Sequence, residues 1–199
     1  MEKKSCISHL YILAGGRSRR FGSDKALAET DGVPMLRSIM NGLGSIDQHI
    51  TLVTGETKRY QEFSVRVITD KPSGVGPIGG LNAALSDRKA HCGEGWLMLV
   101  ACDLIKPHRD WTTPLITQIR STTAPAIAYR GDQWEPMLAL YHTRLLPTID
   151  QMLQRQQCAM HRLLEQVGAQ AVELPDGQTS IPQANTPAEF MAARKLGIA

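Results

Sequence analysis

Apolar runs alternate with amphipathic stretches along most of the chain. The apolar runs predict strands at 7–13, 49–55, 65–70, 96–103, 124–130, 135–142 and 170–175. Apolar residues at helical spacing predict helices at 33–44, 77–87, 111–121, 144–156, 161–169 and 186–197. Strands that alternate with helices are typical of an α/β protein with a mostly parallel sheet and helices on both faces.

Three places on the predicted sheet are candidates for a ligand site. The chain has 199 residues with no internal repeat, low-complexity tract or linker, which predicts one domain. In sheets of this kind, ligands bind at the carboxyl ends of the strands, near the point where the strand order switches. This rule selects the loop after Leu13, the loop after Asp70 and the segment at Asp103.

Composition excludes few classes of protein. A net charge of +3 is too small to predict a nucleic-acid partner. The first apolar run is short and interrupted by His9, so we interpret it as a strand and not as a leader, and no run reaches the length of a membrane span. The four cysteines are Cys6, Cys92, Cys102 and Cys158. They lack the spacing of redox or zinc motifs, which predicts reduced thiols in a cytoplasmic protein.

The loop LAGGRSRRFGSDK, at 13–25, combines glycines with positive charge. Gly15 and Gly16 let backbone N–H groups approach a ligand closely. The cations of the loop are Arg17, Arg19, Arg20 and Lys25. Together these features favour a bound triphosphate over a solvated surface turn. The spacing is not that of a P-loop, so the phosphates must be held differently.

A second glycine cluster, GVGPIGG at 74–80, satisfies G-x-G-x-x-G at Gly74, Gly76 and Gly79. The motif does not directly follow the first strand, so it is weak evidence for a dinucleotide site and for a nicotinamide oxidoreductase. We favour a tight loop that feeds a helix. A loop of this kind is also compatible with a base or ribose pocket.

Two carboxylates follow predicted strands. Asp103 ends the most apolar strand and is either a helix cap or a metal ligand; beside a phosphate loop, Mg²⁺ is the favoured interpretation. Asp70 is a candidate for a ribose or base contact, or for an indirect metal contact. No serine, cysteine or histidine arrangement predicts a covalent nucleophile. A non-catalytic nucleotide-binding protein is the remaining alternative, and the presence of both Lys25 and Asp103 argues against it.

The segment LAGGRSRRFGSDKAL resembles the signature L-A-G-G-x-S-x-R-M-G-x-D-K-x-L of molybdenum cofactor guanylyltransferases of the MobA type, within the nucleotidyltransferase superfamily. Only Phe21 departs from it, where methionine is usual. Further similar segments follow in order: DGVPML (31–36), Asp70, GPIGGL (76–81), ACDL (101–104), EPMLALY (135–141) and NTPAEF (185–190). The resemblance therefore spans nearly the whole chain.

The resemblance implies a three-layer α/β/α sandwich with a Rossmann-like sheet of the nucleotide-diphospho-sugar transferase type. It implies a nucleotide-binding part at about 7–105 and an acceptor-binding part at about 106–199. The implied enzyme transfers GMP from GTP to the phosphate of molybdopterin, giving molybdopterin guanine dinucleotide and pyrophosphate. The alternative is a related transferase that uses CTP with molybdopterin, or another phosphorylated acceptor. Cofactor-biosynthesis proteins and apo-molybdoenzymes are the implied protein partners, with no nucleic acid and no membrane.

The resemblance also implies roles for individual residues. Backbone groups of Leu13, Ala14, Gly15 and Gly16 would hold the nucleotide. Arg20 and Lys25 would face the phosphates, Asp70 and Gly79 would lie by the nucleoside, Asp103 would bind Mg²⁺, and Asn185 would lie near the acceptor. Lys25, Arg20 and Asp103 would be the catalytic residues. An acceptor phosphate oxygen is already anionic, so its attack on the α-phosphate requires no general base.

Three positions depart from the family pattern. Ile105 and Lys106 replace a proline that often follows the C-D-L/T triplet. Gln183 replaces the first of two asparagines in the closing motif, and Thr54 with Gly55 replaces an asparagine that often ends a strand. These changes concern acceptor and nucleoside contacts, so they affect the expected substrate more than the expected reaction.

Overall fold

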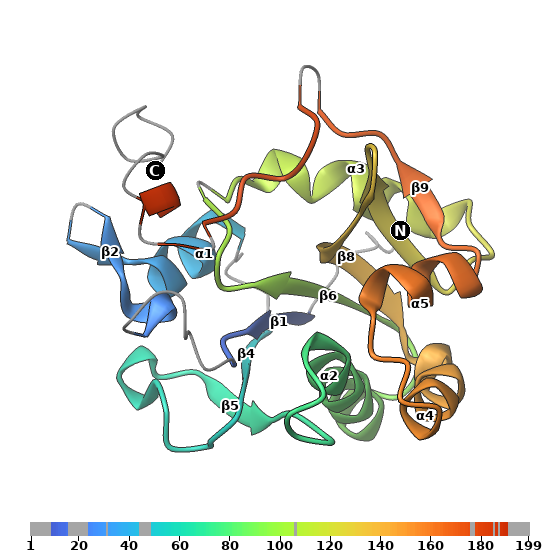
Figure 1. The fold of residues 1–199 in the computed structure, drawn as a ribbon, viewed down its shortest axis with the longest axis horizontal. Coiled ribbons are helices and arrows are strands. Elements are labelled where there is room, and N and C mark those ends of the chain that lie inside the picture. Colours follow the sequence, from blue (N-terminus) through green and yellow to red (C-terminus); the bar gives the residue numbers. More distant parts are fainter. Residues whose placement is uncertain are drawn as a thin grey trace, which may run out of the picture.

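The structure is a computed structural model that describes residues 9–15, 24–30, 32–43, 49–105, 107–175, 178–184, 186 and 188–190. Within them, one seven-stranded sheet has the order β5-β4-β1-β6-β8-β7-β9 (Figure 1). Its strands are β1 (His9–Leu13), β4 (His49–Thr54), β5 (Arg66–Thr69), β6 (Trp96–Ala101), β7 (Ala126–Arg130), β8 (Trp134–His142) and β9 (Gln170–Val172). Strand β8 runs antiparallel to β6 and β7, and the other neighbours are parallel. The predicted mostly parallel sheet is confirmed.

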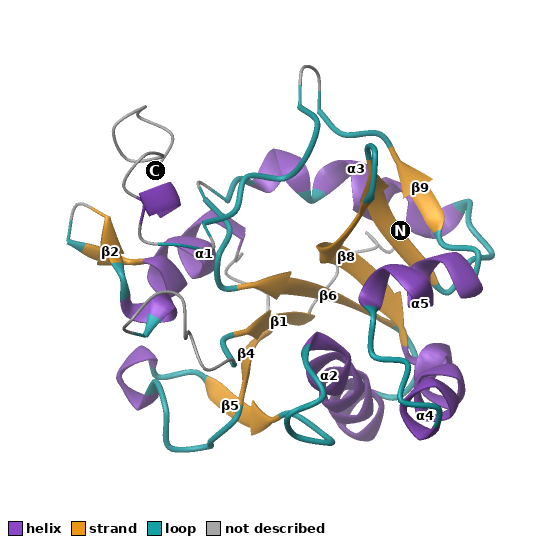
Figure 2. Cartoon of the chain, in the orientation of Figure 1, coloured by secondary structure: helices purple, strands orange, loops and turns teal. Residues whose placement is uncertain are grey.

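Helices and short 3₁₀ turns connect the strands (Figure 2). The α-helices are α1 (Met35–Leu43), α2 (Pro77–Cys92), α3 (Thr113–Thr117), α4 (Leu146–Gln154) and α5 (Met160–Gln166). The 3₁₀ turns are η1 (Lys25–Leu27), η2 (Gln61–Phe63), η3 (Arg109–Trp111), η4 (Gln118–Arg120) and η5 (Thr143–Leu145). A small hairpin pairs β2 (Glu29–Thr30) with β3 (Val33–Pro34). In the described part of the chain, no helix is long and apolar enough to cross a membrane.

Several predicted helix boundaries were wrong. The helix expected at 33–44 begins at Met35, because Val33 and Pro34 pair with the preceding strand instead. The helix expected at 111–121 is divided between η3, α3 and η4. Helix α2 continues past 87 to Cys92. Its last turns are polar and exposed, so they carry no apolar pattern from which the sequence could have predicted them as helix. Of the helix expected at 186–197, residues 188–190 are helical and most of the remainder lies outside the described residues.

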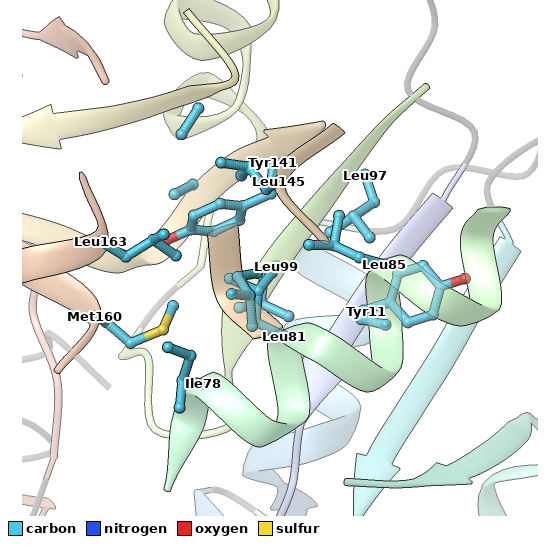
Figure 3. Packing of buried hydrophobic residues seen from close by; sticks show 14 of the residues in the cluster. Tyr11, Ile78, Leu81, Leu85, Leu97, Leu99, Tyr141, Leu145, Met160 and Leu163 are labelled. Atoms are coloured by element: carbon cyan, nitrogen blue, oxygen red, sulfur yellow. The ribbon is translucent and has the colours of Figure 1, made fainter. Parts of the chain in front are cut away.

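Side chains alternate between the two faces of the sheet, so the core forms two layers. On β1, Leu10 and Ile12 pack on the face covered by α1 and α3. Their neighbours Tyr11 and Leu13 pack on the opposite face, with residues of α2, α4 and α5. Figure 3 shows this second layer, where leucines of α2 lie against the sheet near Tyr11 and Tyr141. The molecule is a three-layer α/β/α sandwich, as predicted.

The strand order places a switch point at β1. This strand lies between β4 and β6, and both neighbours are parallel to it. After β1, the chain continues to β4 on one side of that strand. The strand on its other side, β6, follows later in the chain. The connections on the two sides therefore diverge at the carboxyl end of β1. Crevices of this kind bind ligands in open α/β sheets.

Candidate active site

The carboxyl ends of β1 and β6 form the base of the candidate site. The Cys102 N–H donates to the Leu13 carbonyl at 3.1 Å, and the Ala14 N–H donates to the Val53 carbonyl at 2.9 Å. These bonds extend the sheet ladder beyond the strands on both sides of β1. Leu13 and Ala14 are buried, whereas Gly15 is exposed. The opening loop therefore leaves the sheet at Gly15, and the residues just before it are held in place by these hydrogen bonds.

Lys25 and Asp103 meet although 78 positions separate them in the sequence. The Lys25 Nζ lies 2.9 Å from Asp103 Oδ2, and the two side chains are only 12% and 18% exposed. Lys25 begins η1, and Asp24 caps that turn by accepting the Ala26 N–H at 3.1 Å. The backbone of Asp103 is held as well, because its carbonyl accepts the Ala184 N–H at 3.0 Å. The structure thus brings together two of the three predicted catalytic residues.

The second oxygen of Asp103 is chemically available. Oδ1 is buried and has no hydrogen-bond partner among the described residues. A buried carboxylate oxygen without a donor is costly unless a ligand satisfies it, and a hard cation would do so. The described part of the chain contains no group of three or more metal-ligating side chains. Asp103 therefore fits Mg²⁺, which takes most of its other ligands from phosphate oxygens and water.

Asp70 lies at the same edge of the sheet, beyond β5. Its N–H donates to the Thr54 carbonyl at 3.1 Å, and its Oδ1 is buried without a partner among the described residues. Since β5 and β6 are three strand positions apart in the sheet order, the carboxyl ends are roughly 14 Å apart. This separation suits opposite ends of an extended nucleotide and favours a nucleoside contact for Asp70 over a shared metal.

Of the three glycines predicted to bind nucleotide, the structure describes Gly15 and Gly79, and these two have different surroundings. A Cβ on Gly79 would lie 2.4 Å from the Pro72 carbonyl oxygen and 2.8 Å from the Val75 side chain. Its absence allows the loop before α2 to pack on the helix. A Cβ on Gly15 would meet its nearest protein atom, the Gly55 nitrogen, at an ordinary 3.5 Å. Protein packing therefore does not require glycine at Gly15, which leaves that surface open to a ligand.

A cluster that the sequence did not predict surrounds Asp24. The Tyr60 hydroxyl lies 2.9 Å from each Asp24 carboxylate oxygen and 3.1 Å from the Ala14 carbonyl oxygen. The Arg59 guanidinium forms an ion pair with the same carboxylate. Tyr60 has a positive φ of 61°, unusual for a bulky residue and often associated with functional sites. The segment around Tyr60 has neither apolar periodicity nor a motif, so no sequence signal identified it.

The buried thiol of Cys102 does not supply a nucleophile. Burial, and then the nearby charge of Asp103, raises the pKa of this thiol to about 12. The thiol is therefore protonated at neutral pH. Cys92, Cys102 and Cys158 are all free thiols, and Cys6 lies outside the described residues.

The segment 178–184 returns to the site and covers the residues after Asp103. Gln183 forms a bridge with Leu104, and the Ile105 N–H donates to the Pro182 carbonyl at 3.0 Å. Ile105 is buried in a small apolar cluster with Met35, Ala184 and Phe190. The departures at Ile105 and Gln183 therefore have structural roles.

Glu135 of β8 anchors the start of that segment. It accepts the Ile181 N–H at 3.2 Å, and burial raises the pKa of its carboxyl group. A half-buried acid thus joins β8 to the segment that pairs beside Asp103.

Three predicted site residues are not placed. Gly16, Arg20 and Asn185 lie outside the described residues, as do Arg17 and Arg19 of the same loop and Lys106. Their roles remain predictions from the sequence. Thr54 is buried and accepts the Glu56 N–H through its hydroxyl at 3.2 Å, so its side chain serves the turn after β4.

Comparisons with known proteins agree with this fold. The family model of the MobA-like NTP transferase domain matches residues 10–172. A molybdenum cofactor guanylyltransferase of Vibrio atlanticus is 28% identical, over 90% of this chain and 91% of its own length. One of Pseudomonas paraeruginosa is 30% identical, over 89% and 90%. The crystal structure of molybdopterin-guanine dinucleotide biosynthesis protein A from Archaeoglobus fulgidus covers 95% of this chain and 98% of its own, with a TM-score of 0.78 at 20% identity.

Proposed function

The chain belongs to the MobA-like NTP transferase family, and we propose that it is a molybdenum cofactor guanylyltransferase. It would transfer GMP from GTP to the phosphate of molybdopterin and release pyrophosphate. The observation that carries this proposal is the Lys25–Asp103 pair at the switch point of the sheet, where the family's loop meets its metal carboxylate. The Vibrio and Pseudomonas relatives are both named guanylyltransferases, which favours GTP over CTP as the nucleotide.

The residues of the site match the needs of phosphoryl-group transfer. A phosphate acceptor needs no deprotonation, so the enzyme must mainly hold two anions in line and offset charge as pyrophosphate leaves. The Lys25 ammonium, fixed at the start of η1, would move from Asp103 to the phosphates. Arg20 would add a second cation. The Lys25 and Asp103 side chains are only 12% and 18% exposed, so water would screen these interactions less than it would at an open surface.

Mg²⁺ is the proposed cofactor, held by Asp103 and by phosphate oxygens. When bound, it would offset negative charge on the reacting phosphates. The orphaned Oδ1 of Asp103 supports this assignment. The nucleoside would lie toward Asp70, with Gly15 and Gly16 beneath the phosphates and Gly79 near the base or ribose.

The acceptor would bind on the other half of the sheet. We assign nucleotide binding to about 7–105 and acceptor binding to about 106–199, with Asn185 near molybdopterin. A single sheet includes strands from both parts, which supports one domain. We further propose a cytoplasmic enzyme that exchanges its substrate and product with cofactor-biosynthesis proteins and apo-molybdoenzymes.

Pyrophosphate release tests the proposal. The protein is incubated with Mg²⁺ and either GTP or CTP, with and without molybdopterin. We expect release with GTP only when molybdopterin is present. Release of pyrophosphate with CTP but not with GTP would show that the enzyme uses a cytosine nucleotide. Binding of GTP without pyrophosphate release in any combination would contradict the proposed acceptor.

A further inference from the structure

We propose that Tyr60 is a positioning residue that joins Ala14 to Asp24, the two described ends of the opening loop, and sets Lys25 for the triphosphate, acting through Asp24. This inference rests on the proposed function, because it concerns the same nucleotide site. The chain of contacts runs from Tyr60 to Asp24, from Asp24 into the turn that carries Lys25, and from Lys25 to Asp103.

The position of the hydroxyl is the first argument. It reaches Ala14, where the opening loop begins, and Asp24, where the loop ends. One buried phenol therefore joins the two ends of the segment between them. Fixing the ends of a loop removes part of the entropy that ligand binding would otherwise cost.

The protonation state of the phenol is the second argument. Burial, and then the hydrogen bond to Asp24, raises the pKa of Tyr60 far above neutral. The hydroxyl is therefore a hydrogen-bond donor under all ordinary conditions. Its single proton is shared among neighbouring acceptors, and a charged carboxylate is the strongest of these.

The charge of Asp24 is the third argument. A bare carboxylate beside Lys25 would repel the phosphates that Lys25 is expected to bind. The Tyr60 hydroxyl and the Arg59 guanidinium both occupy this carboxylate, and Asp24 is only 24% exposed. The cluster therefore offsets the charge of Asp24 inside the protein, which reduces its repulsion of phosphates bound beside Lys25.

A matched pair of tyrosine variants tests the proposal. Tyr60→Phe removes the hydroxyl and keeps the ring. The control, Tyr11→Phe, removes a buried hydroxyl that donates to Asp87 at 2.8 Å, beside the Arg66–Asp87 ion pair. Both variants lose a hydrogen bond to a paired carboxylate, so both should lose comparable unfolding free energy in urea.

The two variants should differ in nucleotide binding. We expect about a tenfold weaker equilibrium affinity for GTP with Mg²⁺ in Tyr60→Phe, as for loss of a hydrogen bond to a charged group. Tyr11→Phe should bind GTP within twofold of the parent. In an Asp24→Ala background, which removes the acceptor, Tyr60→Phe should add less than about a twofold change, because the two residues act in series.

Three results would overturn the positioning role. These are GTP affinity within twofold in Tyr60→Phe, an equal loss in Tyr11→Phe, or fully additive effects of Tyr60→Phe and Asp24→Ala. Because binding of GTP is measured without molybdopterin, this test is independent of transfer. A parent protein that binds GTP but makes no dinucleotide would contradict the proposed function and leave the Tyr60 test intact.

Discussion

Two clusters of tyrosine, aspartate and arginine lie in different parts of the molecule and share one design. In the first, Tyr11 and Arg66 both contact Asp87, which joins β1 and β5 to α2. In the second, Tyr60 and Arg59 both contact Asp24, which joins the turn after β4 to η1. The same chemistry therefore fastens a helix to the sheet in one place and a ligand loop to the sheet in the other.

The surroundings of each carboxylate explain the difference. Asp87 is 9% exposed and packs among elements of the core, so its bonds contribute to the stability of the fold. Asp24 is more exposed and adjoins Lys25 in sequence, so we propose that its bonds orient that charged residue at the switch point. On this proposal, position relative to the carboxyl ends of the strands, and not residue type, separates the cluster at Asp87 from the cluster at Asp24.

The largest expected effect comes from the site itself. Lys25→Ala should lower turnover at least about 100-fold, as for loss of one preorganised charge contact. Asp103 would also lose its ion-pair partner. Steady-state pyrophosphate release with GTP and molybdopterin measures the effect. Lys89→Ala is the control, because its contact with Glu94 is exposed and distant in sequence from the site motifs. Near-normal turnover in Lys25→Ala would contradict the catalytic assignment.

A change in the cluster of Tyr11, Arg66 and Asp87 should lower the stability of the fold. Asp87→Asn removes the charge that Arg66 and Tyr11 share, and we expect a loss of about 2 kcal/mol in the free energy of unfolding. The affinity for GTP should change less than twofold. Urea denaturation and GTP titration on the same preparation separate the two outcomes. An Asp87→Asn protein that is as stable as the parent but binds GTP weakly would contradict a purely stabilising role for this cluster.

The two glycines extend the comparison to the backbone. Gly79→Ala should destabilise the protein by about 1–2 kcal/mol, because its Cβ would overlap the Pro72 carbonyl. Gly15→Ala should change stability by less than about 0.5 kcal/mol but weaken GTP binding. Thermal denaturation with and without GTP distinguishes them. Equal destabilisation in the two variants would show that packing, not ligand approach, requires glycine at both positions.

The smallest effect concerns pH. Burial alone would raise the pKa of Asp87, but the hydrogen bonds from Arg66 and Tyr11 outweigh it and lower the pKa. Its stabilising contribution is therefore complete above the ordinary carboxyl pKa, and it is lost as the pH falls below about 4. The stability difference between the parent and Asp87→Asn should accordingly shrink at acidic pH. A difference in unfolding free energy that stays constant from neutral to acidic pH would show that the charge of Asp87 is not the source of the stabilisation.

The layers of the fold and the place of the candidate site could be predicted from the sequence for physical reasons. Apolar runs marked the buried strands, and the order of strand and helix predicted the sandwich. Gly15, Lys25 and Asp103 stood out because glycine, charge and carboxylate each followed a predicted strand. The same rule placed the loop after Leu13 and the segment at Asp103 at one edge of the sheet, but the Lys25–Asp103 contact itself was found only in the structure.

Other features could not be predicted because they depend on contacts distant in sequence. The apolar pattern of 135–142 indicates burial but not direction, so it does not predict that β8 runs antiparallel between β6 and β7. The contact between Tyr60 and Asp24 forms only in the folded chain, so the sequence around Tyr60 does not predict it. Likewise, the packing role of Ile105 depends on Phe190, which is far along the chain.

Identification of the product tests the central claim most directly. The protein is incubated with Mg²⁺, molybdopterin and an equimolar mixture of GTP and CTP, and the products are analysed by mass spectrometry. We expect molybdopterin guanine dinucleotide and an equal amount of pyrophosphate, with neither formed by Lys25→Ala. The cytosine dinucleotide, or no dinucleotide from a protein that binds GTP, would contradict the assignment of a guanylyltransferase.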